Sequence, residues 1–430
     1  MSSFLVLPST LGGLVEESSG SVDCLCFGSG RFLRSVLVPA LVGAGLRPAI
    51  LQTRGRSFLE YCSKRGSLEY EVDTVGRDGV VSTEHVPCYG AGTLGSSEGT
   101  AAAFDLISKM KSISVIGVGV TEGGLSSASN QAMVNLAALL RHVMKMGVAC
   151  ENPNGKICII NTDNVPNNGS VIFHHMMELA KEKNDDAFVE FLKNRVTFHN
   201  TMVDRITSQR PDSDGMVPRC EPVPAKACVV EDLDGDLPPN LTTPELRQAF
   251  GWVVRSQRGE LSCDIALKLR VANGTHTAAA HVMALVGLTM TDALSSKSDG
   301  GATLILVYLD ALFQTQILPA ATPDYGKAET KAVYEDWRRR LCHAHFGLST
   351  FFITQNGAAK GGIRIAPTIR SLLAHNNPVT ASTVYAVAAI LRFLTPIVGQ
   401  GGSVNGIYRG WLDGAKCSTE QHGSSPEHTV

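Results

Sequence analysis

The sequence lacks an excess of either charge. Its 38 Lys and Arg residues nearly balance 40 Asp and Glu residues, so the formal net charge is −2. A chain with this balance has no overall basic field that would draw it onto nucleic acid or an anionic membrane surface. We therefore expect neither of these as a partner.

Long hydrophobic runs are also absent. The longest apolar stretches, residues 277–290 and 379–391, are shorter than the roughly 18–20 residues of a membrane span and are more typical of buried helices. The first basic residue is Arg31, so the N-terminus lacks the positive start of a secretory signal and the arginines of a transit peptide. These absences favour a cytoplasmic protein.

Several chemical signatures are missing as well. The 11 cysteines follow no regular framework, which is typical of reduced thiols in a reducing compartment. Cys24-Leu25-Cys26 and Cys342-His343-Ala344-His345 have no second pair at the spacing of a structural zinc site, so we expect no metal. Neither a Gly-x-Ser-x-Gly elbow nor a Walker lysine motif occurs, which disfavours a serine hydrolase and a nucleotide kinase.

The first half of the chain alternates predicted strands with predicted helices. Residues 23–27, 48–53, 112–120 and 156–162 read as buried strands, and helical patterns lie between them. This alternation is typical of an α/β fold with a Rossmann-type, doubly wound parallel sheet. Residues 208–238 collect prolines, aspartates and short strand-like pieces, and we interpret them as a connecting region.

From Thr243 onward, nearly the whole sequence has helical periodicity. The expected helices are residues 244–253, 265–285, 302–318, 330–345 and 379–394. We therefore predict a Rossmann-like dinucleotide-binding domain at residues 1–240 and a mostly α-helical substrate and catalytic domain at residues 241–416. Residues 417–430 are polar and aperiodic, and we expect them to form a disordered tail.

A glycine turn follows the first expected strand. Gly28-Ser29-Gly30 would let the backbone turn tightly and approach a pyrophosphate at the N-terminus of the next helix. Leu33 replaces the third glycine of the common fingerprint, and a plain strand-to-helix turn gives the same pattern. The second strand ends without the acidic residue that would bind an adenosine 2′-hydroxyl, whereas Arg54 could hold a 2′-phosphate. The cofactor could therefore be NAD or NADP.

Two polar loops could contribute to a site. Residues 161–169 directly follow a strand, where side-chain amides point into the ligand crevice of an open α/β sheet, and Asn164 could donate to a substrate oxygen. The same density of Asn, Asp, Pro and Gly is common in plain turns. Asp204 and Arg205 follow an apolar pair, which is also consistent with a buried ion pair or a cap.

The most informative pattern lies in residues 268–281. Lys268, Asn273 and His276 occur in an otherwise apolar helical pattern and span a sector of about 140°. Lys268 and His276 would be roughly 12 Å apart along a straight helix, and Gly274 is where it could bend. A lysine in apolar surroundings has a lowered pKa, which suits a general base. The alternative is that Lys268, Asn273 and His276 each have their own polar partners or reach solvent, and form no common site.

The chain resembles the polyol-specific long-chain dehydrogenases, also called the mannitol dehydrogenase family. The resemblance runs from about residue 22 to about residue 370, and its most specific part is Lys268-x4-Asn273-x2-His276. The family contains mannitol 2-dehydrogenase, mannitol-1-phosphate 5-dehydrogenase, fructuronate reductase and tagaturonate reductase. The other matching segments are residues 28–34, Val120-Thr121-Glu122-Gly123-Gly124, Asp163-Asn164 with Asn168-Gly169, and residues 198–206.

The resemblance implies a metal-independent interconversion of a secondary alcohol and a ketone that uses NAD or NADP. The substrate would be an acyclic polyol, a keto sugar, a sugar acid or a sugar phosphate. Lys268 matches the family's general base, and His276 matches the residue that positions the substrate. Asn164 and Asn273 match the amides that hydrogen-bond the developing alkoxide.

The resemblance also implies binding residues. Asp204 and Lys360 look like further substrate contacts, the latter through the segment Asn356-Gly357-Ala358-Ala359-Lys360. Cofactor contacts are expected from the glycine turn and from segments that follow the strands: Gly28, Ser29, Gly30, Arg31, Phe32, Arg54, Thr121 and Glu122.

The chain departs from the family at two places. Relatives of mannitol 2-dehydrogenase carry a glutamate as a proton relay three residues before the lysine, but Ile265 stands here and Asp264 is one position off. Eight residues before Lys360, where those relatives have a substrate-binding arginine, this chain has Phe352. We therefore expect the far end of the substrate to be bound differently.

Two other functions stay open. The missing relay acid and arginine also fit a non-catalytic dinucleotide-binding sensor. A two-domain hydroxy-acid dehydrogenase, which also uses a Lys and an Asn on a helix, would need a carboxylate-binding arginine facing Lys268, and Arg270 and Arg364 are the candidates. Nothing in the sequence marks a subunit interface, so the oligomeric state is left open.

Overall fold

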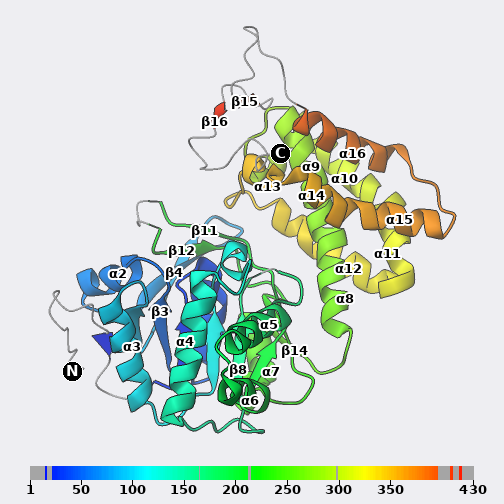
Figure 1. Cartoon of the computed structure of the whole chain (residues 1–430). Helices are drawn as coiled ribbons and strands as arrows, with labels where there is room; N and C mark the ends of the chain where they lie inside the picture. Colours follow the sequence, from blue (N-terminus) through cyan, green and yellow to red (C-terminus); the bar gives the residue numbers. More distant parts are fainter. Residues whose placement is uncertain are drawn as a thin grey trace. The chain divides into compact units, whose positions relative to one another are not determined.

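The computed structural model describes residues 22–163, 165–211, 215–296 and 299–395, together with the backbone of residues 15–16, 407–409 and 416–418 (Figure 1). The chain divides into two compact units. The first comprises the residues up to Gly76 and Val81–Leu261, and the second comprises Arg77–Val80 and the chain from Ser262 onward.

A mostly parallel sheet forms the centre of the first unit. Its strand order is β1-β6-β3-β2-β7-β8-β9; β1 pairs antiparallel with β6, and all other neighbours are parallel. This is the doubly wound order, with its switch point between β2 and β7, and it confirms the predicted Rossmann-type fold class. The strands are β1 (Val15–Glu16), β2 (Cys24–Phe27), β3 (Pro48–Gln52), β6 (Gly90–Thr93), β7 (Val115–Val118), β8 (Ile157–Asn161) and β9 (Val196–His199).

Helices cover both faces of this sheet, as Figure 1 shows. Side chains alternate along β2, so Leu25 and Phe27 belong to one hydrophobic core, while Cys24 and Cys26 belong to the other. Residues of α3, α4, α5 and α6 complete the first core, and residues of α1 and α2 complete the second. These helices are α1 (Val38–Gly43), α2 (Ser57–Arg65), α3 (Ser97–Lys109), α4 (Gln131–Met146), α5 (Asn168–Lys181) and α6 (Asp186–Asn194).

Two smaller sheets complete the first unit. Their orders are β11-β12-β4-β5 and β10-β13-β14. Both take strands from residues 208–238, so this stretch is more than the connection that the sequence indicates; its strands are only three or four residues long and show little alternation. The strands are β4 (Tyr70–Val75), β5 (Val81–Val86), β10 (Thr201–Val203), β11 (Thr207–Gln209), β12 (Pro218–Cys220), β13 (Cys228–Glu231) and β14 (Trp252–Arg255).

The boundary between the units differs from the predicted division at residues 240 and 241. The helix expected at residues 244–253 ends early: α7 (Pro244–Phe250) stops at Gly251, which has a φ of 60°, and β14 follows. A β-carbon at position 251 would lie 2.2 Å from the carbonyl oxygen of Pro224. Because β14 then pairs with β13, the chain stays in the first unit until Leu261.

The second unit is helical, as predicted. Helix α9 is buried from Gly274 to Ala284 and packs among α10, α13 and α16. The helices are α8 (Glu260–Leu267), α9 (Gly274–Leu285), α10 (Gly300–Leu312), α11 (Leu318–Tyr325), α12 (Lys327–Leu341), α13 (Thr350–Thr354), α14 (Gly357–Lys360), α15 (Ala366–Ala374) and α16 (Ala381–Leu394). π-Helical segments occur at Leu33–Leu37 in the first unit and at Lys268–Asn273, Phe313–Ile317 and Gly361–Ile365 in the second.

One helical run is longer than the sequence suggests. Gly300–Tyr325 is continuous over 26 residues, and its length and composition would allow it to cross a membrane. The expectation that every apolar stretch is too short is therefore wrong for this run. Half of its most apolar part is buried inside the protein. A core helix of a globular unit can have the same length and apolar composition as a membrane span.

The last described elements are two short strands. β15 (Ile407–Arg409) and β16 (Lys416–Ser418) pair antiparallel. The expected tail at residues 417–430 lies outside the described residues, apart from the backbone of Cys417 and Ser418.

Candidate active site

The glycine turn lies at the switch point of the sheet. Gly28 directly follows β2 and has a φ of 107°, which favours glycine. A β-carbon at position 28 would lie 2.3 Å from the carbonyl oxygen of Gly119, the residue that follows β7. The turn therefore needs glycine for its conformation and for its close approach to the neighbouring strand.

The missing third glycine has a counterpart directly after β7. Leu33 is fully buried, and a β-carbon at position 119 would lie 2.6 Å from the β-carbon of Leu33. In the common fingerprint, the third glycine allows the helix to pack closely on the sheet. In this chain the small residue of the contact is Gly119, directly after the strand, and the large residue is Leu33, on the helix.

The side chain of Arg34 holds the glycine turn in place by a hydrogen bond. Its buried side chain donates from Nε to the carbonyl oxygen of Ser29 over 2.8 Å and from Nη1 to that of Met216. Tyr70 donates its hydroxyl hydrogen to the Arg34 carbonyl oxygen over 2.6 Å. Burial lowers the pKa of the Arg34 guanidinium. The sequence prediction did not count Arg34 among the site residues, although its position four residues after Gly30 is a signal that could have found it.

The remaining expected cofactor residues follow the carboxyl ends of β2, β3 and β7, which lie at one edge of a parallel sheet. Gln52 is buried and accepts a hydrogen bond at Oε1 from the Phe58 backbone N–H, so it helps to begin α2. The expected contacts at this edge include exposed side chains: Arg31, Arg54, Thr121 and Glu122. Ser29 and Phe32 are half-buried.

The loop expected to supply an amide is held at both ends. Asn164 itself lies outside the described residues. Before it, Asn161 Oδ1 accepts from the Asp163 backbone N–H over 3.0 Å. After it, the buried Asn168 donates to the Asp163 carbonyl oxygen over 2.8 Å and to Thr201 Oγ1 over 2.9 Å. The loop around Asn164 is therefore anchored to β8 and β10.

Asp204 and Arg205 follow β10. Asp204 is half-buried, and its backbone N–H donates to the Ala227 carbonyl oxygen over 2.9 Å. Arg205 is buried and donates to the carbonyl oxygens of Ser35 and Glu221 over 2.6 and 3.1 Å. Arg205 thus ties the strand to the first helical segment through backbone carbonyl oxygens, which is a structural role but not the ion pair or cap that the sequence left open.

Lys268 and Asn273 begin and end a π-helical segment. Both side chains are half-buried, whereas His276 is 8% exposed and lies 5.0 Å from the Trp337 ring, centroid to centroid. A π-helical turn inserted in an α-helix is frequent at functional sites. The irregular part of this helix is therefore a π-helical turn, which begins at Lys268 and ends three residues before His276.

Gly274 has a different role from the predicted bend. Its φ and ψ of −65° and −51° are helical. A β-carbon there would lie 3.2 Å from the carbonyl oxygen of Arg364, so the glycine allows the segment Gly361–Ile365 to pack closely against the helix. The prediction of a bend at Gly274 is wrong because its backbone is regularly helical, and the absence of a side chain there favours close packing instead.

The two family departures can be placed on their elements. Asp264 is 5% exposed and lies four residues before Lys268, a spacing that puts the two on one face of a regular helix. Ile265, at the expected relay position, is half-buried. Phe352 is 61% exposed on α13.

The two arginines named for a carboxylate site have different surroundings. Arg270 is buried and donates to Asp324 Oδ2 over 3.1 Å and to the Ala320 carbonyl oxygen over 2.9 Å, so its charge is already paired. Arg364 is half-buried and donates from Nη1 to Thr277 Oγ1 over 2.9 Å. Lys360, one helical turn earlier, donates to the Ile353 carbonyl oxygen over 2.8 Å.

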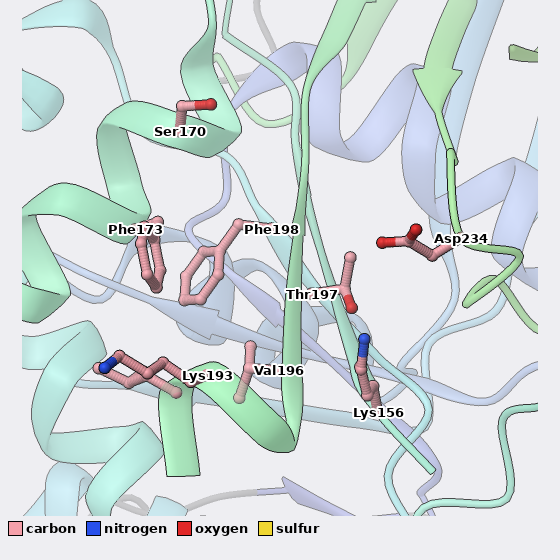
Figure 2. A pocket seen from close by; sticks show the side chains of 9 residues that line it. Lys156, Ser170, Phe173, Lys193, Val196, Thr197, Phe198 and Asp234 are labelled. Atoms are coloured by element: carbon pink, nitrogen blue, oxygen red, sulfur yellow. The ribbon is translucent and has the colours of Figure 1, made fainter. Parts of the chain in front are cut away.

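A pocket of about 310 Å³ lies elsewhere in the first unit, beside β9 (Figure 2). Figure 2 shows the rings of Phe173 and Phe198 next to each other, with Lys156 and Asp234 on the other side of Thr197. None of its lining residues is an expected site residue. Within the described parts of the chain, no group of three or more His, Cys, Asp or Glu side chains could hold a metal ion.

Comparison with known proteins identifies the first unit. Residues 23–233 match the mannitol dehydrogenase Rossmann domain. Residues 23–233 therefore form a Rossmann domain of the mannitol dehydrogenase family. The match includes the glycine turn, the Asn161–Gly169 loop and Asp204, and it ends before Lys268.

Curated relatives cover a smaller part of the chain. Mannitol dehydrogenase DSF1 and mannitol dehydrogenase 2 of Saccharomyces cerevisiae (strain ATCC 204508 / S288c) are each 27% identical to it over 173 residues. This stretch is 37% of this chain and 31% of each relative. The match therefore spans about a third of the length of the two yeast mannitol dehydrogenases.

Two solved structures of dehydrogenases share the fold over most of the chain. Substrate-free D-sorbitol dehydrogenase is similar with a TM-score of 0.69, 17% identity and coverage of 89% of this chain and 82% of that one. Mannitol 2-dehydrogenase of Pseudomonas fluorescens, solved with NAD and D-mannitol, has a TM-score of 0.65, 16% identity and coverage of 90% and 81%. At these identities the likeness shows the fold, which in both cases extends beyond the matched Rossmann domain.

Proposed function

We propose that the chain is a metal-independent NAD- or NADP-dependent oxidoreductase that interconverts a secondary alcohol and a ketone on an acyclic polyol, a sugar acid or a sugar phosphate. The observation that carries the proposal is the match of residues 23–233 to the mannitol dehydrogenase Rossmann domain. Support comes from Lys268, Asn273 and His276 on one helical run of the second unit.

The first unit fits a dinucleotide. Gly28 and Gly119 leave no room for β-carbons at the switch point, and a β-carbon on Gly30 would lie 3.3 Å from the Gly119 carbonyl oxygen. A bound pyrophosphate would meet the N-terminus of the next helix there. Arg31 and Arg54 are exposed cations that could contact phosphates, and no acidic residue occurs in residues 52–56. A nicotinamide cofactor held there would supply the hydride acceptor for oxidation of the alcohol, or the hydride donor for reduction of the ketone.

Residues of the second unit would accept the proton of the substrate hydroxyl and bind the substrate oxygen. In the direction of oxidation, Lys268 Nζ takes the hydroxyl proton while the substrate C–H bond breaks and its electron pair leaves with the hydrogen as hydride. The products are a ketone, the reduced cofactor and one proton, which passes from Lys268 to solvent. Asn273 and Asn164 would donate hydrogen bonds to the oxygen as negative charge develops on it. His276 would hold the neighbouring hydroxyl.

A turnover assay tests this function. Oxidation of NADH and NADPH is followed at 340 nm with fructose, fructose 6-phosphate, tagaturonate and fructuronate as substrates. We expect oxidation with at least one of them, and a loss of at least a thousandfold in Lys268→Ala because removal of the base stops proton transfer. Binding of the reduced cofactor, measured by its fluorescence, should change less than threefold.

The same assay separates the alternatives. Equal turnover in Lys268→Ala would overturn the role of the lysine. Cofactor binding without oxidation of any of these substrates would favour the dinucleotide-binding sensor, which the missing relay acid at position 265 also fits.

A further inference from the structure

Acidic residues are absent from two long stretches of the second unit. Residues 265–291 and 337–412 contain no Asp or Glu. At the chain's average of 40 acidic residues in 430, the 76 residues of the second stretch would contain about seven. Both stretches keep basic residues, among them Lys268 in the first and Lys360 and Arg364 in the second. The net charge of the whole chain hides this local excess of positive charge.

The two stretches pack against each other. The Arg364 carbonyl oxygen is 3.2 Å from the position of a β-carbon on Gly274, which lies between Asn273 and His276 in the sequence. Arg364 Nη1 also donates to Thr277 Oγ1 over 2.9 Å. Arg364 is therefore held against the helix that carries the proposed reacting groups.

Lys360 and Arg364 lie four residues apart, and both are partly withdrawn from water. Burial lowers the pKa of Lys360 to about 8, with a smaller contribution from the charge of Arg364, and burial lowers that of Arg364 to about 10. Their hydrogen bonds go to a carbonyl oxygen and a hydroxyl. Within the described residues, neither forms an ion pair with a carboxylate.

Four other buried or partly buried arginines have carboxylate partners or several hydrogen bonds, whereas Arg47 and Arg219 each keep at least one buried side-chain nitrogen without a hydrogen bond. Arg270 and Arg338 pair with Asp324 and Asp310. Arg34 and Arg205 lack carboxylate partners, but each donates at least three hydrogen bonds to backbone or side-chain oxygens. Arg364 donates one. A buried cation without an opposite charge is costly, and an anionic ligand would remove that cost.

We propose that Lys360 and Arg364 form an anion subsite that binds a carboxylate or a phosphate at the far end of the substrate. This inference rests on the proposed function and narrows it from neutral polyols to sugar acids or sugar phosphates. Arginine offers two parallel N–H groups to either anion, and lysine adds a point charge. The subsite also accounts for Phe352, since an arginine at that position is not needed when Arg364 supplies the charge.

Binding measured without turnover tests the subsite. Calorimetry on the full chain, with and without saturating NADH or NADPH, compares D-gluconate and D-glucitol 6-phosphate with neutral D-glucitol. We expect at least tenfold tighter binding of one anionic probe, and the better of the two distinguishes carboxylate from phosphate. Arg364→Gln, which keeps a donor for Thr277, and Lys360→Met should each reduce that preference at least fivefold, whereas Arg364→Lys should restore part of it.

Arg370→Gln is the matched control because Arg370 is exposed on the adjoining helix α15. It should leave binding of all three probes unchanged. Equal affinity for anionic and neutral probes would overturn the proposal, and so would loss of NADPH binding, rather than of gluconate or glucitol 6-phosphate binding, in Arg364→Gln. If anion binding depends on Arg364 but no substrate is turned over, the subsite stands and the proposed function fails. The reverse pattern, turnover without anion preference, leaves the function and removes the subsite.

Discussion

At the scale of single residues, the clearest lesson comes from Leu33 and Gly119. By its local motif alone, Leu33 looks like a missing glycine, because the compensating Gly119 lies 86 positions away, directly after another strand. The same limit explains Arg34, whose acceptors include Met216, and Gly274, whose neighbour is Arg364. Residue types and local spacing could be predicted from the sequence, whereas these partners come from distant parts of the chain.

Replacement of Gly119 by Ala tests whether this glycine makes room for the Leu33 side chain. The new methyl group would lie 2.6 Å from Leu33 Cβ, so Leu33 must shift and the glycine turn with it. We expect a loss of about 1–3 kcal/mol in the free energy of unfolding, as in overpacked cores, together with weaker binding of reduced cofactor. Gly123→Ala is the control, since a β-carbon there would only touch Thr121 Oγ1 at 3.9 Å. Equal effects of the two substitutions, measured by denaturant unfolding and cofactor fluorescence, would contradict this packing.

His281 makes stability depend on pH. Burial, opposed by the hydrogen bond of Nδ1 to the Thr277 carbonyl oxygen and aided by the charges of Lys360 and Arg364, lowers its pKa from 6.5 to about 4. Because the folded-state pKa is the lower one, the stabilising effect is complete above pH 6.5 and is lost as the pH falls toward 4. The difference corresponds to about 3 kcal/mol.

Thermal unfolding between pH 7 and pH 4 measures this effect. His281→Gln keeps a donor for Thr277 and removes the titration, so its stability should fall less over this range. His375→Gln is the matched control, since exposed His375 places Nδ1 2.8 Å from the carbonyl oxygen four residues earlier in the same way. Parallel pH profiles for His281→Gln and the unsubstituted protein would show that His281 does not carry the effect.

At the scale of elements, the buried strands of the Rossmann sheet were the most predictable. β2, β3 and β8 lie within the predicted ranges because continuous apolar runs mark strands covered on both faces. The strands β9 to β14 have three or four residues each and were mostly missed, since so few residues show no period. The π-helical segments could not be predicted either, although those at residues 33–37, 268–273 and 361–365 adjoin expected site motifs.

Deletion of Ala272 tests whether the π-helical turn positions the site. Removal of one residue should convert the segment to regular α-helix and rotate Lys268 by about 100° relative to His276. We expect turnover to fall at least a hundredfold, while binding of reduced cofactor by the first unit changes little. Deletion of Thr315 from the other segment, Phe313–Ile317, should lower the melting temperature but leave turnover within tenfold. Normal turnover without Ala272 would remove the positional role of the segment.

At the scale of the whole molecule, the order of secondary structure was enough to predict a Rossmann-type unit followed by a helical one. The exact division was not, because β14 returns to the first unit after α7, and a sequence window cannot show that it pairs with β13. The candidate residues divide accordingly: the expected cofactor residues, Asn164 and Asp204 fall in the first unit, and Lys268, Asn273, His276 and Lys360 in the second. The family match covers the first group, so the roles of the second are proposals that experiment must test.

The central claim is that hydride passes between a nicotinamide and a substrate carbon. It is tested most directly by incubating the protein with fructose, fructose 6-phosphate, tagaturonate and fructuronate in turn, together with NADH or NADPH that carries deuterium at the transferable position. Mass spectrometry then measures the alcohol product. The account predicts a product that is one mass unit heavier than the product made with unlabelled cofactor, and no such product with Lys268→Ala. If none of these four keto substrates acquires deuterium while the cofactor binds, the chain is not this oxidoreductase.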